Sequence, residues 1–299
     1  MPLSLDQALT GISGILVTPY DDKGDVAPEK LAPILDRALG AGLHMPVVNG
    51  NTGEFYALTT EEASTMTREV VRLVDGRAPV LAGIGRGVRD ACALAKVSAE
   101  AGASALMVHQ PPDPFVSPRG IVDYLKAVID ASGGLPVMLY LRNDAIGTAA
   151  IADLCALPMV KGVKWATPNP LKLAEARAAC DPAIVWVGGL AEVWAPTFYA
   201  VGARGFTSGL INVWPERSLA IHAALEAGDF AKANTLIADM QAFEEIRAEE
   251  MNGTNVTGVK AALQALGRDC GPTRPPSAWP LTPTQKAKLD AFIADNQLT

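Results

Sequence analysis

The chain has 299 residues, of which 49% are hydrophobic and 19% are charged, and its formal net charge is -7. These proportions are typical of a compact α/β enzyme and exclude a disordered or fibrous protein. The acidic balance provides no basic surface for a phosphate backbone, so we expect no nucleic-acid partner.

Short segments rich in Val, Ile and Leu alternate with longer segments of helical period, and the pair recurs about every 25 to 30 residues. The expected strands are, in chain order, Gly14–Thr18, His44–Asn49, Pro79–Gly83, Ser104–His109, Leu135–Leu141, Met159–Trp165, Ile184–Gly188 and Gly205–Ser208. The expected helices are Pro28–Leu39, Thr60–Val74, Ala91–Glu100, Arg119–Ala131, Ala150–Leu157, Leu171–Cys180, Ala191–Val201 and Pro215–Leu225. Eight strands that are each followed by a helix predict a closed (β/α)₈ TIM barrel over residues 1–228.

Residues 229–299 show no strand pattern and predict a C-terminal helical extension. Its expected helices cover Phe230–Ala248 and Val256–Leu266, and a Pro-rich bend at Pro272–Pro280 precedes a last helix that begins at Thr282. The extension can cover the barrel or help to build an oligomer, and the sequence leaves both alternatives open.

A glycine-rich turn after the third strand raises a competing architecture, the doubly wound dinucleotide-binding fold. The turn reads Gly83-Ile84-Gly85-Arg86-Gly87-Val88. Val88 stands where the fingerprint of that fold requires its third glycine. We therefore interpret the segment as a tight turn between a strand and a helix.

Lys164 is the strongest candidate for a catalytic residue, because catalytic groups of such barrels lie at the C-terminal ends of the strands. In the strand Met159–Trp165, alternation places Val163 and Trp165 on one face and Gly162 and Lys164 on the other. The apolar face suits the surrounding helices, so Lys164 is expected to point into the barrel. Burial there would lower its pKa towards nucleophilic use, whereas the alternative is a lysine that escapes to solvent.

Two further features are placed to assist such a lysine. Tyr140 ends the fifth strand and can act as a proton relay, or can simply close the core with its hydroxyl hydrogen-bonded. The loop Asn49–Phe55 combines two glycines with small polar residues, so its N–H groups can converge on a carboxylate. A plain turn is the alternative for this loop.

Several other chemistries lack a motif. Three dispersed histidines and no H-E-x-x-H spacing give no metal site, and no G-x-S-x-G elbow supports a serine hydrolase, so we expect no metal and no cofactor. The cysteines form no C-x-x-C pair, which is typical of free thiols in the cytoplasm. Residues Met1–Asp6 lack a basic region followed by an apolar core, and no uncharged apolar run approaches the roughly 18 residues of a membrane span, so we expect neither secretion nor membrane insertion.

A series of ordered motifs carries a family resemblance over nearly the whole chain. The motifs are Gly14–Pro19, Gly50–Glu54, Tyr140, Gly162–Lys164, Val259–Lys260 and Arg274–Pro276. Together they resemble the dihydrodipicolinate synthase and N-acetylneuraminate lyase superfamily. The resemblance implies that Lys164 forms an imine with a 2-keto acid, that Tyr140 relays protons, and that Asn51 and Thr52, within the Gly50-Asn51-Thr52-Gly53-Glu54 loop, bind the substrate carboxylate.

Two departures weigh against the lysine-biosynthetic reaction of that superfamily. The chain has Pro111-Pro112-Asp113 where those synthases usually carry Pro-Tyr-Tyr, whose tyrosine joins the proton relay. Ala145 replaces the arginine that contacts the carboxylate of their aldehyde substrate.

The pattern is more similar to 5-dehydro-4-deoxyglucarate dehydratases. The matching segments are Gly53–Leu58, Tyr140 with Arg142, Ala191–Pro196, Ser208, Asn212 and Pro215. That group commonly has an acidic residue after the imine lysine, where this chain has Trp165 and Ala166.

We therefore expect a Schiff-base lyase that dehydrates a 3-deoxy-2-keto sugar acid, with decarboxylation where a second carboxylate is present. Arg142 is the candidate for that distal carboxylate, and Ser208 for a hydroxyl or water, with a structural role equally open for Ser208. A pyruvate-dependent aldolase or condensing enzyme and a non-catalytic keto-acid sensor are the alternatives. The expected partners are the small-molecule substrate and further copies of the chain in a homo-oligomer, either a dimer or a tetramer.

Overall fold

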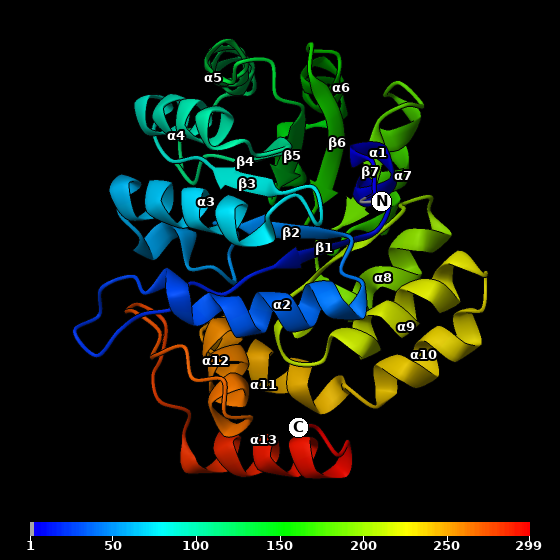
Figure 1. Cartoon of the computed structure of the whole chain (residues 1–299). Coiled ribbons are helices and arrows are strands. Elements are labelled where there is room, and N and C mark those ends of the chain that lie inside the picture. Colours follow the sequence, from blue (N-terminus) through cyan, green and yellow to red (C-terminus); the bar gives the residue numbers. More distant parts are fainter. Residues whose placement is uncertain (1–2) are drawn as a thin grey trace.

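The computed structural model describes residues 3–299, and its centre is a closed barrel of eight parallel strands (Figure 1). The strands are β1 (Ile12–Ile15), β2 (Met45–Val48), β3 (Leu81–Ile84), β4 (Ala105–His109), β5 (Val137–Leu141), β6 (Val160–Trp165), β7 (Val185–Gly188) and β8 (Phe206–Ser208). Each strand pairs with the next in sequence, and β8 pairs with β1 to close the barrel. The predicted (β/α)₈ fold is confirmed, and the doubly wound alternative is wrong.

Helices follow the strands and cover the outside of the barrel. They are α2 (Ala32–Ala41), α3 (Thr60–Val74), α4 (Val88–Ala101), α5 (Pro118–Ala131), α6 (Thr148–Cys155), α7 (Pro170–Ala178), α8 (Ala191–Ala200) and α9 (Pro215–Glu226). Helix α3 has the predicted bounds because Thr59 and Glu62 form a capping box at its start. Helices α5, α7 and α9 begin with a proline, whose fixed φ favours the first helical turn.

Side chains separate into a core inside the barrel and a larger core between strands and helices. The interior is filled by Ile15, Met45, Val47, Leu81, Ala105, Met107, Met138, Tyr140 and Val187. Ala8 and Leu9 belong to this cluster, and they lie on a short helix, α1 (Leu5–Leu9), that precedes β1. Helix α1 therefore closes the N-terminal end of the barrel, so access to the interior is from the C-terminal ends of the strands.

The first strand begins two residues earlier than expected and ends at Ile15. The backbone N–H of Val17 donates to the side-chain oxygen of Asn212 at 3.3 Å rather than to a neighbouring strand. The side chain of Asn212 thus takes the place of a strand–strand hydrogen bond at Val17. The pattern of apolar residues could not indicate this early end of the strand.

The glycine-rich turn between β3 and α4 is structural. A side chain at Gly83 would collide with the carbonyl oxygen of Asn49, which an ideal Cβ would approach to 2.2 Å. Arg86 has a left-handed φ of 72° and donates hydrogen bonds to the carbonyl oxygens of Phe55 and Leu58, both at 2.6 Å. The turn therefore fastens the loop after β2 to the barrel.

The C-terminal extension consists of α10 (Phe230–Ala238), α11 (Gln241–Asn252), α12 (Asn255–Ala265) and α13 (Pro283–Asp295). It packs against the barrel on the side of α8 and α9 (Figure 1). The single helix expected over Phe230–Ala248 is wrong, because the chain breaks before α11, where Met240 is buried in the outer core. Among residues 3–299, none of the helices has the length and apolar character that a bilayer crossing requires.

Candidate active site

Lys164 lies on β6 and points into the barrel, as alternation predicts. Its neighbours Val163 and Trp165 belong to the outer core, and only 3% of Lys164 is exposed. Burial, followed by the positive charge of Arg142, lowers the pKa of Lys164 to about 7. A large fraction of the amine is therefore neutral near physiological pH, which a nucleophile requires.

Tyr140 lies beside Lys164, because β5 and β6 pair these two residues in register. The Nζ atom of Lys164 is 3.8 Å from the centre of the Tyr140 ring. The hydroxyl of Tyr140 accepts a hydrogen bond from Nδ2 of Asn51 at 2.9 Å. Burial raises the pKa of Tyr140 to about 12, so the phenol keeps its proton and can donate it.

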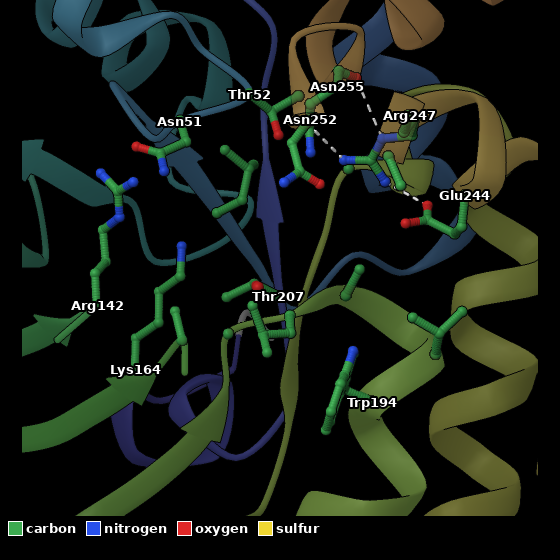
Figure 2. A pocket seen from close by; sticks show the side chains of 18 of the residues that line it. Asn51, Thr52, Arg142, Lys164, Trp194, Thr207, Glu244, Arg247, Asn252 and Asn255 are labelled. Atoms are coloured by element: carbon green, nitrogen blue, oxygen red, sulfur yellow. Dashed lines mark hydrogen bonds and ion pairs between the residues drawn. The ribbon is translucent and has the colours of Figure 1, made fainter. Parts of the chain in front are cut away.

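The loop after β2 brings Asn51 and Thr52 over the same space (Figure 2). The loop is a compact turn in which Gly53 and Phe55 donate backbone hydrogen bonds to the carbonyl oxygen of Gly50, at 3.0 and 3.3 Å. Both glycines are required by packing: an ideal Cβ would lie 2.4 Å from the Ile15 side chain at Gly50, and 2.9 Å from the Leu16 carbonyl oxygen at Gly53. The loop therefore presents Asn51 and Thr52 and uses Gly50 and Gly53 to hold its shape.

Glu54 does not face the cavity, contrary to the expectation that it contacts substrate. Its Oε1 atom lies 2.7 Å from Nζ of Lys260, and its Oε2 atom accepts a hydrogen bond from the backbone N–H of Arg274 at 2.8 Å. Both oxygens are thus occupied by the C-terminal extension, and a buried carboxylate is strongly attracted to such partners.

Arg142 follows Tyr140 at the C-terminal end of β5 and lines the cavity. Figure 2 shows it on the same side of the cavity as Lys164 and Asn51. Its side chain is exposed, and its backbone N–H donates to Oε1 of Gln110 at 2.8 Å, which fixes the start of the loop. A guanidinium in this place can bind a carboxylate at the mouth.

Ser208 is turned away from the cavity, so the expectation that it handles a substrate hydroxyl is not supported. Its hydroxyl donates to Oε1 of Glu192 at 2.5 Å, lies 3.1 Å from the hydroxyl of Ser218, and accepts from the backbone N–H of Ile211 at 2.9 Å. These partners lie outside the barrel. The preceding residue, Thr207, lines the cavity instead (Figure 2).

The cavity above Lys164 has a volume of about 460 Å³ and reaches the C-terminal extension. Its far wall is formed by polar residues of α11 and α12, namely Gln241, Glu244, Glu245, Arg247, Asn252 and Asn255. Arg247 is engaged by Glu244 and by Oδ1 of Asn255, the latter at 3.0 Å (Figure 2). Sequence reasoning missed this wall, because nothing in the pattern of the extension shows which of its residues reach the barrel mouth.

His109 is buried behind Tyr140, with 5.0 Å between the ring centres. Burial, followed by the charge of Lys164, lowers the pKa of His109 to about 3, so the ring is neutral. Its Nε2 atom lies 3.0 Å from the carbonyl oxygen of Asn49, and its Nδ1 atom lies 3.5 Å from the hydroxyl of Tyr56. His109 therefore supports the wall behind Tyr140.

Asp113, which stands where the related synthases usually carry a relay tyrosine, lies on an exposed loop.

Comparison with known proteins places this arrangement in a family. The model of the "Dihydrodipicolinate synthetase family" matches residues 8–296, and the chain belongs to this family. The fold and the family define the protein as a lyase of the Schiff-base type. The relatives are named as enzymes, which counts against a non-catalytic sensor.

Two relatives with different names are similar to the chain to the same degree. A "Probable 5-dehydro-4-deoxyglucarate dehydratase" of Rhizobium rhizogenes is 30% identical, over 98% of this chain and 97% of the relative. A "4-hydroxy-tetrahydrodipicolinate synthase" of Exiguobacterium sp. is 31% identical, over 94% and 95%. Among solved structures, dihydrodipicolinate synthase from Oceanobacillus iheyensis superimposes with a TM-score of 0.93 at 36% identity, covering 98% of each chain.

Proposed function

We propose that this protein dehydrates a 3-deoxy-2-keto sugar acid, such as 5-dehydro-4-deoxyglucarate, through an imine on Lys164. The observation that carries the proposal is the placement of the Lys164 amine against Tyr140 and beneath Asn51 and Thr52. A 2-keto acid bound with its carboxylate at Asn51 and Thr52 offers its ketone carbon to the amine.

Tyr140 is the proposed proton carrier, and it gives or takes one proton at each step of the dehydration. The amine of Lys164 adds to C2, and one of its protons passes to the C2 oxygen to give a neutral carbinolamine. The phenol of Tyr140 then protonates the C2 hydroxyl, which leaves as water and yields the protonated imine and a phenolate. The phenolate then removes a proton from C3 and forms an enamine, with the iminium as the electron sink. The phenol returns this proton to the C4 hydroxyl, which leaves as a second water.

In a substrate with a second terminal carboxylate, carbon dioxide leaves while the imine is still in place, because the conjugated iminium accepts the electron pair of the broken bond, and a proton from solvent restores the iminium. Water then attacks C2 and gives a proton to the Tyr140 phenolate. The hydroxyl proton of the resulting carbinolamine moves to nitrogen as the C–N bond breaks, which releases the product and the neutral amine of Lys164. Arg142 is the proposed contact for that carboxylate, because among the cationic residues lining the cavity it is exposed towards the mouth, while Arg247 is already engaged by Glu244 and Asn255.

The shape and chemistry of the cavity favour a sugar acid over pyruvate alone. The space extends from Lys164 to α11, well beyond the reach of a three-carbon acid. Gln241, Asn252 and Asn255 provide amide groups, which can donate to and accept from hydroxyl groups. A hydroxylated chain fits such a wall better than an apolar one.

The second candidate is an aldolase or condensing enzyme, which the same imine supports. Cleavage between C3 and C4 would give pyruvate and an aldehyde from the same intermediate. Ala145, which stands where the dihydrodipicolinate synthases usually carry a carboxylate-binding arginine, argues against the aldehyde of lysine biosynthesis.

A panel of 3-deoxy-2-keto sugar acids tests the proposal. Each acid is incubated with the enzyme and scored for carbon dioxide, pyruvate and dehydrated product. Dehydrated product without pyruvate supports the dehydratase, and pyruvate with an aldehyde would replace it with the aldolase.

We also propose that the chain forms a homo-oligomer, a dimer or a tetramer, in the cytoplasm. Phe115 and Leu171 are 92% and 78% exposed, and burial of such large apolar side chains against another copy would be favourable. The four free cysteines are compatible with a reducing compartment. Sedimentation analysis of the full chain tests the assembly: a monomer at micromolar concentration would contradict it.

A further inference from the structure

A buried ion pair joins the loop after β2 to the C-terminal extension. The Nζ atom of Lys260, on α12, lies 2.7 Å from Oε1 of Glu54, and the side chains are 0% and 2% exposed. The same ammonium donates to the carbonyl oxygen of Pro272 at 2.8 Å and lies 4.1 Å from the centre of the Tyr20 ring. Lys260 is therefore saturated with partners at a site that water does not reach.

The second carboxylate oxygen of Glu54 is also held by the extension. It accepts the backbone N–H of Arg274 at 2.8 Å. The guanidinium of Arg274 pairs with Glu62 at 2.6 Å and donates to the carbonyl oxygen of Ala57 at 3.1 Å. The extension thus binds the segment that contains Glu54 at several points, and Lys260 supplies the charge buried most deeply.

Glu54 in turn sets the shape of the carboxylate-binding loop. It has a left-handed φ of 54°, a conformation that a residue with a side chain adopts only when its surroundings impose it. Its N–H donates to the carbonyl oxygen of Asn51 at 2.9 Å, and Thr18 donates to the carbonyl oxygen of Gly53 at 2.6 Å. A displacement of Glu54 therefore moves Asn51 and Thr52, which line the cavity directly before it.

We propose that Lys260 is a positioning residue for the substrate carboxylate. It acts through Glu54 to hold Asn51 and Thr52 above Lys164, so that the C-terminal extension is part of the catalytic unit. The inference rests on the proposed imine chemistry of Lys164. Removing one partner of a buried ion pair leaves the other charge without compensation, so the strained loop is expected to relax when Lys260 is replaced.

The test uses Lys260→Met in the full chain, with Lys286→Met as the matched control. Lys286 lies on α13 of the same extension, and its ion pair with Asp290, at 2.7 Å, is exposed. Two quantities are measured: the pyruvate concentration that gives half-maximal borohydride trapping, and the extent of trapping at saturation. Lys260→Met is expected to raise the half-saturating concentration about 10-fold or more, with trapping at saturation within about 2-fold of wild type. Lys286→Met should change neither quantity.

Amide hydrogen exchange of residues 50–57 gives a readout that needs no imine. Faster exchange in Lys260→Met, but not in Lys286→Met, is the expected result. If the wild-type protein is not trapped by borohydride, the proposed function fails, and the exchange rates still decide whether Lys260 holds the loop. Unchanged exchange, or an unchanged half-saturating concentration in a folded Lys260→Met protein, overturns the inference.

Glu54→Gln covers the outcome in which Lys260→Met does not fold. Glutamine keeps the length and an acceptor for the N–H of Arg274 but removes the negative charge. The variant should raise the half-saturating pyruvate concentration in the same direction. The double variant should be no worse than the poorer single variant, because both act through one contact. Additive effects of the two substitutions would contradict a path from Lys260 through Glu54.

Discussion

The amine of Lys164 faces the ring of Tyr140, with 3.8 Å between Nζ and the ring centre, and the two residues are paired in register on β6 and β5. Strand pairing, rather than a flexible loop, therefore fixes the distance between the proposed nucleophile and the proposed proton carrier. The hydroxyl of Tyr140 is held in turn by Asn51, so one chain of contacts joins the amine, the phenol and the carboxylate loop.

The rate of imine formation should depend on pH through Lys164. Only the neutral amine attacks a ketone, and burial lowers the pKa of Lys164 to about 7. The rate of borohydride trapping with pyruvate should therefore rise as the pH rises through about 7 and level off above it. A rate that continues to rise to pH 10 would indicate an ordinary, solvated lysine.

Replacing Arg142 should move this profile and weaken the use of diacid substrates. Arg142→Ala removes a positive charge that helps to lower the pKa of Lys164, so the inflection should shift to higher pH. At high pH, trapping with pyruvate should remain intact, whereas kcat/KM for a diacid should fall about 10- to 100-fold through the lost charged contact.

Arg72→Ala is the matched control for that variant. Arg72 lies in the last turn of α3, at the opposite end of the barrel, and pairs with Glu69 on the surface. It should change neither the pH profile nor the kinetics. Unchanged kinetics of Arg142→Ala on diacids would remove Arg142 from the substrate site.

Tyr140→Phe should separate the proton relay from the packing of the site. Phenylalanine keeps the ring against Lys164 but removes the hydroxyl, so the fold should be preserved. Turnover should fall about 10²- to 10⁴-fold, the contribution typical of a positioned acid or base. Stopped-flow and steady-state kinetics measure the loss, and turnover within a few-fold of wild type would assign the proton transfers to another group.

Ser208→Ala should lower stability and leave substrate kinetics unchanged. Its hydroxyl binds Glu192, Ser218 and the backbone of Ile211 outside the barrel, so its removal leaves buried groups without a partner. The free energy of unfolding should decrease by about 1–3 kcal/mol. Denaturant titration and steady-state kinetics measure the two effects.

Thr207→Ala should show the opposite behaviour, because Thr207 lines the cavity: kcat/KM should change by up to about 10-fold, with little loss of stability. If Ser208→Ala instead lowered kcat/KM and Thr207→Ala lowered only stability, Ser208 rather than Thr207 would be the residue that contacts substrate.

The sequence predicted the barrel because strands alternate regularly with helices along the chain. It predicted the orientation of Lys164 because side chains alternate between the two faces of a strand. The same rule applied to β8 indicates Thr207, since Phe206 is apolar and belongs to the outer core. The prediction of Ser208 relied on family similarity in place of that rule. Helix α1 was not among the expected elements, although Ser4 and Gln7 form a capping box at its start that is visible in the sequence.

Other parts of the site have no local signal. In the sequence, Glu54 is an ordinary polar residue of a loop. Its partner Lys260 lies in a helix that is distant in sequence, so only the fold reveals their ion pair. The far wall of the cavity likewise depends on how α11 folds over the barrel mouth. Asn252 lies in a left-handed conformation, with a φ of 66°, that no pattern of apolar residues predicts.

The central claim is that Lys164 forms the imine, and reductive trapping tests it most directly. The full-length protein is incubated with pyruvate, reduced with borohydride, digested and mapped by mass spectrometry. We expect one adduct, on the peptide that contains Lys164, and none in Lys164→Ala. An adduct on another lysine, or no adduct at a pH well above 7, would contradict the proposed mechanism.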